Sequence, residues 1–255
     1  MSDFAHTYGP WAVIAGASEG IGAAFATALA ARNCKLVLIA RRLPELEAFA
    51  ATLRTETLCL SLDMASDFSA ALLAACSGRE VGLAIYNAAF APEGPFAQAA
   101  LPDLQRSIAV NCFAPVAFAH AFAAAMQQRG RGGLILMSSL AGFQGSPGIA
   151  VYGATKAFNL VLGEALWKEL AASGVRVLAC CAGAVLTPSY IRSGRGRAPG
   201  QLEPETVAEE TLRALEHGPL IIPGLFNRLA SFVMRRLLPR RTAVSIMAAQ
   251  SDMRP

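Results

Sequence analysis

The stretch that decides the fold is Trp11–Gly22, which reads WAVIAGASEGIG. It begins with an uncharged apolar run, as a strand buried on both faces of a parallel sheet does. Gly16, Gly20 and Gly22 follow, and an alanine-rich helical pattern then continues to about Arg32. Glycines in a strand-to-helix turn allow a diphosphate to approach backbone N–H groups at the helix N-terminus. The stretch predicts a nucleotide-binding unit. Its G-x-x-x-G-x-G spacing differs from the common fingerprint, so a tight turn without a ligand is the alternative.

The rest of the chain repeats this alternation of strand and helix. Further strands are expected at 35–40, 57–62, 82–86, 133–137, 175–181 and 220–222, and helices at 43–53, 68–76, 102–128, 152–173 and 204–217. The order predicts an α/β fold, a Rossmann-like doubly wound parallel sheet of about seven strands in a single domain. We expect residues 1–255 to form one NADP-binding domain, with a substrate lid at 188–201 and a C-terminal helical extension at 224–255.

Composition narrows the class of protein. Hydrophobic residues make up 54% of the chain and charged residues 16%, which excludes a largely disordered protein. The net charge of +4 is too small to predict a nucleic-acid partner. The six cysteines form no C-x-x-C pair and the three histidines form no cluster. We therefore expect free thiols, no metal site and, without a secretory signal pattern at the N-terminus, a cytoplasmic location.

One segment imitates a membrane span. Residues 107–128 carry no formal charge, but Asn111, Pro115 and His120 interrupt them. A buried helix of the α/β core is favoured over a span, with a bend expected near Pro115.

The end of the second strand favours one cofactor. The glycine-rich turn predicts an acidic residue there if a ribose 2′-hydroxyl is bound, but the chain has Arg41 and Arg42. Because arginine can bind a 2′-phosphate that an acid would repel, NADP(H) is favoured over NAD(H). Two solvated arginines are the alternative, and the carboxylate of Glu19 is expected near the same phosphate.

Tyr152 and Lys156 are the first candidates for chemistry. They are four residues apart in a helical pattern and so lie on one helix face. A neighbouring cation favours the phenolate and lowers a tyrosine pKa that is ~10 when unperturbed. The Ser139 hydroxyl could then orient a substrate oxygen towards the phenol. A partly buried tyrosine beside a solvated lysine is the alternative for this pair alone.

The order and spacing of these motifs resemble the short-chain dehydrogenase/reductase family, classical type. The resemblance extends from about Tyr8 to the seventh strand, and it is carried by the residues 16–22, Asp63, Asn87-Ala88-Ala89, Asn111, Ser139 and Tyr152-x-x-x-Lys156. It implies an NADP(H)-dependent oxidoreductase that interconverts a ketone or aldehyde and an alcohol on a fairly apolar substrate. A non-catalytic nucleotide-binding regulator and a membrane-surface-associated protein of the same fold are the alternatives.

The resemblance also implies roles for individual residues. Ser139 would bind the substrate oxygen, Tyr152 would be the general acid or base, Lys156 would bind the nicotinamide ribose and lower the tyrosine pKa, and Asn111 would hold a water linking Lys156 to solvent. The implied cofactor-binding set is Gly16, Ser18, Glu19, Gly20, Ile21, Gly22, Arg41, Arg42, Asp63, Met64, Asn87, Ala88, Tyr152, Lys156, Val185 and Thr187. Ala15, Ala89 and Ala182 depart from the family pattern and put local loop geometry in question more than activity.

The predicted partners follow from the remaining segments. A homodimer or homotetramer is expected through the helix 152–173, and the pocket walls are expected at 90–96, 141–149 and 189–201. Near the C-terminus an apolar helix face is flanked by Arg228, Arg235 and Arg236; it comprises Leu225, Leu229, Phe232, Val233 and Leu237. A helix that caps the pocket or packs on a partner subunit is favoured, and weak contact with a membrane surface is the alternative. Substrate identity, reaction direction and stereochemistry stay open.

Overall fold

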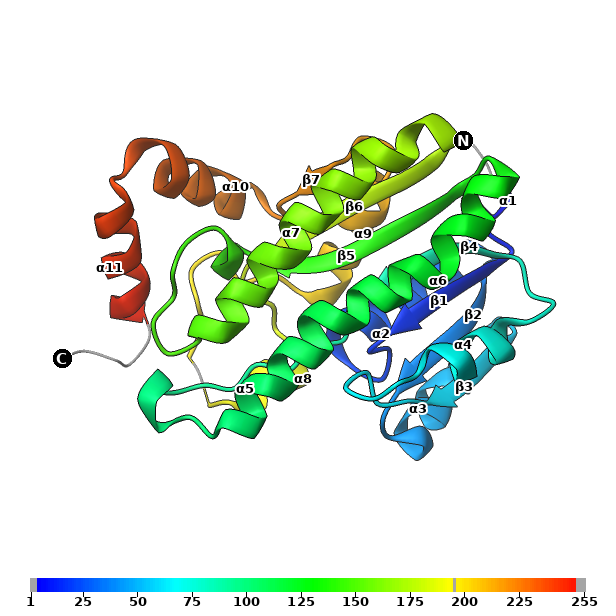
Figure 1. Ribbon diagram of the computed structural model, residues 1–255, viewed down its shortest axis with the longest axis horizontal. Coiled ribbons are helices and arrows are strands. Elements are labelled where there is room, and N and C mark those ends of the chain that lie inside the picture. Colours follow the sequence, from blue (N-terminus) through cyan, green and yellow to red (C-terminus); the bar gives the residue numbers. More distant parts are fainter. Residues whose placement is uncertain (1–3, 195, 251–255) are drawn as a thin grey trace.

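The computed structural model describes residues 4–194 and 196–250, which form one sheet with helices on both faces (Figure 1). All strand pairings are parallel, in the order β3-β2-β1-β4-β5-β6-β7. The strands are β1 (Trp11–Ala15), β2 (Lys35–Ala40), β3 (Thr57–Ser61), β4 (Val81–Tyr86), β5 (Gly132–Ser139), β6 (Val175–Ala182) and β7 (Leu220–Ile221). This order confirms the predicted doubly wound α/β fold.

Eleven α-helices are described in the residues 4–194 and 196–250. They are α1 (Phe4–Tyr8), α2 (Gly20–Ala30), α3 (Leu43–Ala50), α4 (Ser69–Cys76), α5 (Leu101–Ile108), α6 (Ala114–Arg129), α7 (Ala150–Leu170), α8 (Pro188–Arg192), α9 (Pro204–Ala214), α10 (Leu225–Phe232) and α11 (Arg240–Gln250). The bounds of the predicted helices differ by a few residues, as helix ends commonly do, while α1 and α8 were not predicted.

The apolar strands are explained by two cores, one on each face of the sheet. Alternate residues of β1 point to opposite sides, so Ile14 joins the core under α2 and α9 while Val13 joins the core under α4 and α6. A strand covered on both faces needs apolar residues at every position, which is why β1 shows no polar alternation. The order reverses between β1 and β4, and a crevice for ligands lies beyond the carboxyl ends of strands at such a point.

The long helix predicted at 102–128 is interrupted one turn before Pro115. The turn Ala109–Phe113 is π-helical and separates α5 from α6. The Ala114 N–H donates to the Ala109 carbonyl, and Pro115 has no N–H. The buried carbonyls of Val110 and Asn111 are therefore left without a helical donor and need other donors. Tyr86 Oη donates to the Val110 carbonyl at 2.6 Å, and Asn159 Nδ2 donates to the Asn111 carbonyl at 3.0 Å. The irregularity expected near Pro115 is therefore a π-helical turn that ends two residues before it.

Within the described residues, Leu101–Arg129 is one continuous helical stretch long and apolar enough to span a membrane by length and composition. In the fold its inner side, with Phe118, Phe122 and Met126, packs into the core on β4 and β5. Its outer side leaves Phe113 and Val116 exposed. The stretch has the packing of a core helix, and its exposed side is available to another surface.

We predict that Tyr86→Phe lowers the free energy of unfolding by about 1–3 kcal/mol, because it leaves the buried Val110 carbonyl without its hydroxyl donor. Urea unfolding measures the change. Tyr190→Phe is the matched control, since its hydroxyl bonds an exposed carbonyl on the lid and its loss should change the free energy by less than about 0.5 kcal/mol. Equal effects of the two variants would contradict the assignment.

Candidate active site

The glycine turn is packed tightly at the carboxyl end of β1. Gly16 has a φ of +81°, and a Cβ there would lie 2.8 Å from the backbone of Ala88. A Cβ on Gly22 would lie 1.9 Å from the Gly16 carbonyl oxygen. Asn87, which follows β4, donates through Nδ2 to that same oxygen at 2.8 Å. Only glycine fits at 16 and 22, and the turn is joined to the end of the neighbouring strand.

The N-terminus of α2 has the donors that a diphosphate needs. The helix begins at Gly20, so the N–H groups of Gly20, Ile21 and Gly22 belong to its first turn and have no helical acceptor. Glu19 is the N-cap residue, and its side chain makes no capping hydrogen bond. Backbone donors without a cap, together with the positive end of the helix dipole, fit an anionic cofactor group. Ser18 precedes them in the same turn.

The Glu19 carboxylate is instead held by arginines. Arg192 of α8 donates to both of its oxygens, at 2.6 and 3.1 Å, and Arg42 lies 3.7 Å away. Glu19 therefore lies near Arg42, one of the two arginines predicted to bind the phosphate. The Arg192 contact joins the predicted lid to the glycine turn, and it is an exposed pair.

Asp63 lies just after β3, beside buried Met64, and is an ionised carboxylate. Partial burial acts to raise its pKa, but the Ala65 N–H at 2.9 Å and the Arg106 guanidinium at 2.6 Å together hold the pKa below its usual value. Arg106 also lies 5.7 Å from the centre of the Phe90 ring. Sequence analysis missed Arg106 because it is 43 positions from Asp63 and no local pattern links the two.

The end of β5, which carries Ser138 and Ser139, packs against the first turns of α7, which carry Tyr152 and Lys156. Ser138 and Ser139 lie inside β5, which pairs with β6 beyond the predicted strand end. The Lys156 ammonium lies 5.5 Å from the centre of the Tyr152 ring. Ser138 Oγ donates to the Lys156 carbonyl at 2.7 Å. A Cβ on Gly142 would lie 2.8 Å from the backbone at Lys156, so this glycine permits the loop after β5 to pack closely on α7.

Lys156 is the most unusual charge of the site, since it is only 3% exposed. Its Nζ donates to the Met137 carbonyl at 2.8 Å. Burial lowers the pKa of Lys156 to about 8. Burial also raises the pKa of Cys180 to about 12 and that of Cys181 to about 11, so these neighbouring thiols are neutral at pH 7. Among the described residues no carboxylate forms an ion pair with this ammonium.

The Ser139 hydroxyl is placed to act as a donor. Its Oγ accepts the Ala141 N–H at 3.2 Å, and this bond leaves the hydroxyl hydrogen for another group. Ser139 and Tyr152 are both partly buried.

Asn111 occupies the π-helical turn and joins three elements. Its Oδ1 accepts the Phe90 N–H at 2.9 Å, and its Nδ2 lies within hydrogen-bond distance of the Phe90 carbonyl, Ser107 and Thr155. The water relay expected for Asn111 stays a prediction. The structure gives its side chain a further role, which is to fix the start of the predicted 90–96 wall against α5 and α7.

The predicted walls of the pocket are linked to one another. The Gly94 N–H donates to the Gly148 carbonyl at 2.8 Å, joining the 90–96 and 141–149 loops. The predicted lid is closed at its base, because the Leu186 N–H donates to the Leu202 carbonyl at 2.9 Å and the Leu202 N–H donates to the Ala184 carbonyl at 3.1 Å. Buried Val185 lies at this base, and Thr187 caps α8 by accepting the Tyr190 N–H at 3.1 Å.

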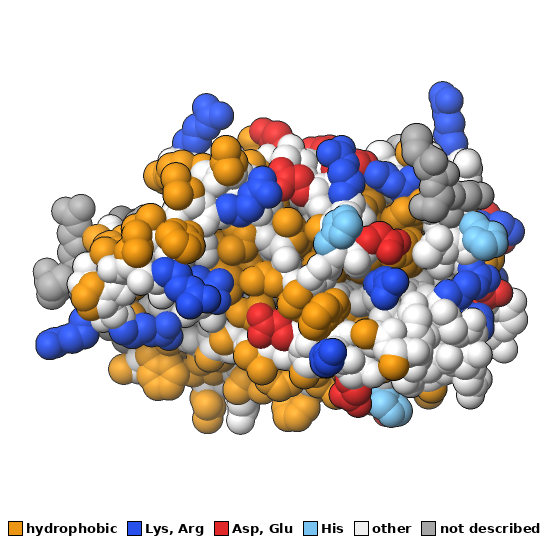
Figure 2. All heavy atoms as spheres, turned by 90° about the horizontal axis from the view of Figure 1, so that it is seen from above, with side chains coloured by type: hydrophobic (Ala, Val, Ile, Leu, Met, Phe, Trp, Pro, Cys, Tyr) orange, Lys and Arg blue, Asp and Glu red, His pale blue; other side chains and the backbone are white. Residues whose placement is uncertain are grey.

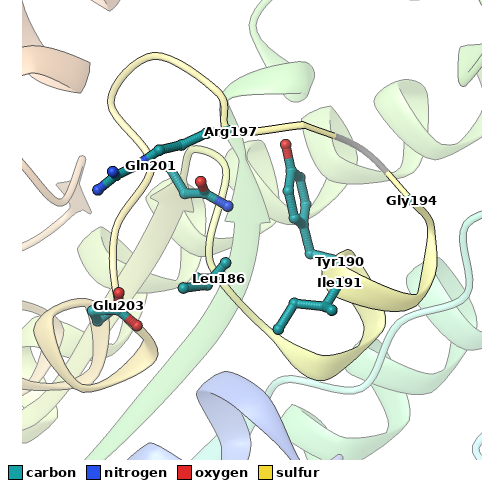
Figure 3. A pocket seen from close by; sticks show the side chains of 7 residues that line it. All are labelled: Leu186, Tyr190, Ile191, Gly194, Arg197, Gln201 and Glu203. Atoms are coloured by element: carbon teal, nitrogen blue, oxygen red, sulfur yellow. The ribbon is translucent and has the colours of Figure 1, made fainter.

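A cavity of about 500 Å³ lies under the lid rather than at the serine and tyrosine (Figure 3). It is lined by Leu186, Tyr190, Ile191, Gly194, Arg197, Gln201 and Glu203. None of Ser139, Tyr152 and Lys156 lines it, so this cavity lies beneath the predicted lid and is separate from the predicted catalytic side chains. Arg195 of the predicted lid lies outside the described residues, as do residues 251–255 of the predicted extension. The described residues contain no group of three or more His, Cys, Asp and Glu side chains suited to a metal ion.

The chain is similar to known proteins over most of its length. The family profile of the short chain dehydrogenases matches residues 10–197. A 7beta-hydroxysteroid dehydrogenase of Collinsella aerofaciens is 30% identical over 232 residues, covering 87% of this chain and 88% of that protein. A solved 7beta-hydroxysteroid dehydrogenase structure is 27% identical, with a TM-score of 0.90, and the match covers 96% of this chain and 99% of that one. A short-chain dehydrogenase from Sphingobium yanoikuyae, solved in complex with NADPH, is 31% identical with a TM-score of 0.80, covering 96% of both chains.

We predict that Lys156→Met stabilises the cofactor-free protein by about 1–3 kcal/mol at pH 7, because it removes a buried ammonium that lacks an ionic partner. The folded pKa of about 8 lies below the ordinary value of 10.5, so the unfolded chain binds more protons between these values. The difference should be complete below pH 8 and should fade as the pH rises towards 10.5. Urea unfolding at several pH values measures it. Lys168→Met, on the exposed side of α7, should show no such pH dependence.

Proposed function

Because the chain belongs to the short-chain dehydrogenase/reductase family, we propose that it is an NADP(H)-dependent oxidoreductase interconverting a ketone or aldehyde and an alcohol on a fairly apolar substrate. The observation that carries the proposal is the group of Ser139, Tyr152 and Lys156, with the cation 5.5 Å from the tyrosine ring and buried. Family membership supports an oxidoreductase acting on a CH–OH or carbonyl group. The cofactor and the substrate are the finer part of the proposal.

The protein's part in the chemistry is to hold the substrate oxygen and move one proton. The nicotinamide, when bound, supplies or accepts the hydride at the substrate carbon. Tyr152 Oη gives its proton to the substrate oxygen during reduction and takes it back during oxidation. Ser139 donates a hydrogen bond to the same oxygen and fixes its direction. Lys156 stabilises the negative charge left on the phenol, and burial strengthens this interaction because water is excluded.

Two observations support NADP(H) as the cofactor. Arg41 and Arg42 follow β2 and are exposed, so both guanidinium groups can reach a 2′-phosphate. A relative that was solved in complex with NADPH matches 96% of this chain at 31% identity. Glu19 lies near the same place, but its charge is balanced by Arg192 and Arg42. Balanced in this way, Glu19 does not exclude a phosphate from the site.

The substrate class is inferred from the pocket walls. Phe143 is buried on one wall, while Phe96 and Ile191 are more than half exposed on the other two predicted walls. The exposed apolar side chains on two of the walls favour an apolar substrate, whereas Phe143 packs into the small core cluster with Leu160 and Cys181. The hydroxysteroid relative is consistent with this class.

We further propose a homodimer or homotetramer assembled through α7 and the neighbouring helical turn. Phe158 and Val161 on α7 are exposed, and so are Phe113 and Val116 beside it. An apolar surface of this kind is typical of an interface between subunits.

We predict that Tyr152→Phe lowers turnover by at least about 10²-fold, since the Tyr152 phenol is the group that transfers the proton in the proposed mechanism. The decrease in NADPH absorbance with a panel of ketones measures turnover, and NADPH binding should be kept. Tyr8→Phe is the control, because the Tyr8 hydroxyl donates to Glu216 at 2.6 Å and lies away from the site. Full turnover by Tyr152→Phe would refute the mechanism. A wild-type protein that binds NADPH but reduces no carbonyl would instead favour the nucleotide-binding regulator.

We predict that Arg41→Ala and Arg42→Ala each raise the KM for NADPH about tenfold or more, through the loss of a charge-assisted hydrogen bond, and leave the KM for NADH nearly unchanged. Steady-state kinetics with both cofactors measures the ratio. Arg54→Ala, an exposed arginine at the end of the α3 region, should leave both constants as they are. Equal losses with NADPH and NADH would rule out recognition of the 2′-phosphate.

A further inference from the structure

Helix α10 is turned with its polar side inward. Asn227 and Ser231 are buried. Four apolar side chains of the same helix, between 55% and 75% exposed, face outward: Leu225, Phe226, Leu229 and Phe232. The sequence analysis favoured an apolar face that caps the pocket or packs on a partner subunit. In the part of the chain that the structure describes, this face caps no pocket, because Leu225, Leu229, Phe232 and Leu237 are exposed.

Hydrogen bonds explain this orientation. Asn227 Nδ2 donates to the Gly200 carbonyl at 3.0 Å and to the Pro223 carbonyl at 3.1 Å. A Cβ on Gly200 would lie 2.3 Å from Asn227 Oδ1, so the glycine makes room for this amide. Rotating α10 to bury its apolar side would break both hydrogen bonds. The outward apolar face is therefore fixed by the fold.

The segment that carries this face is strongly basic. Residues 218–250 contain five arginines and no aspartate or glutamate; the arginines are Arg228, Arg235, Arg236, Arg240 and Arg241. In the part of the chain that the structure describes, no carboxylate pairs with any of the five. Figure 2 shows hydrophobic and basic side chains side by side at the end of the molecule formed by α10 and α11.

Two of these arginines attach the segment to the predicted pocket wall. Arg240 donates to the Phe143 carbonyl at 2.7 Å, and the Arg235 guanidinium lies 4.0 Å from the centre of the Phe143 ring. Arg228 and Arg236 are exposed and have no such contact. Together with Arg241, which is also exposed, they are available to an external partner, and they are the two arginines in α10 and the turn that follows it.

We propose that the α10 face, formed by Leu225, Phe226, Leu229 and Phe232 together with Arg228 and Arg236, docks on the surface of a bilayer that contains anionic phospholipids. Apolar side chains inserted at the headgroup boundary and arginines beside anionic headgroups are together what an interfacial helix requires. Two copies of this chain meeting through the same face would bring their arginines together without an acidic residue on α10 to balance them. Charge complementarity therefore favours the lipid surface over a second copy.

The test is co-sedimentation of the full chain with vesicles of phosphatidylcholine alone or with phosphatidylglycerol added. We expect sedimentation with the anionic vesicles at low salt, little with phosphatidylcholine alone, and release at high salt, since salt screens the arginines. Phe226→Ser with Leu229→Ser, and separately Arg228→Gln with Arg236→Gln, should each weaken binding about tenfold or more. Leu73→Ser on α4 and Arg54→Gln are matched controls that should bind as the unchanged protein does.

NADPH binding by every variant shows that the fold is intact. Absence of sedimentation at any lipid composition would overturn the proposal, as would binding unchanged by both paired variants. The size of the protein in solution tests whether a second copy of the chain covers the face instead. If the protein does not bind vesicles and forms an oligomer that dissociates in the Phe226→Ser, Leu229→Ser variant, the face is an interface between two copies.

Discussion

The burial of the Lys156 ammonium is the constraint on which the site depends. A cation that is 3% exposed loses its hydration, and here a backbone carbonyl and the face of Tyr152 replace only part of it. The surrounding structure must hold the charge in place, through the end of β5, the Ser138 bond and the close approach at Gly142. Because the same burial excludes water, the ammonium stabilises a neighbouring phenolate more strongly. Burial of Lys156 therefore both lowers the local stability and supports the proposed chemistry.

The interruption between α5 and α6 serves both the fold and the site. Pro115 and the π-helical turn leave two buried carbonyls that Tyr86 and Asn159 satisfy. The same turn directs the Asn111 amide at Phe90 and towards Thr155 on α7. One departure from regular helix therefore connects the central sheet, the predicted 90–96 wall and the helix that carries Tyr152.

Arginines define the rim of the site. Arg192 joins the lid helix to Glu19 in the glycine turn, Arg106 fixes Asp63, and Arg240 holds the Phe143 loop. Each contact joins segments far apart in the chain, and each is at the edge of the crevice rather than in the core. The rim is thus organised by charge, while the sheet below it is organised by apolar packing.

Local pattern in the sequence determined the fold and much of the candidate site. Apolar runs without alternation indicated a sheet covered on both faces, and glycines between strand and helix located the predicted phosphate turn. The four-residue spacing placed Tyr152 and Lys156 on one face of α7. The tertiary structure alone decided the burial of Lys156, the pairing of Arg106 with Asp63, the partners of Asn111 and the outward turn of the α10 apolar face. Periodicity reports which neighbours share a face, whereas these features depend on contacts between segments distant in the chain.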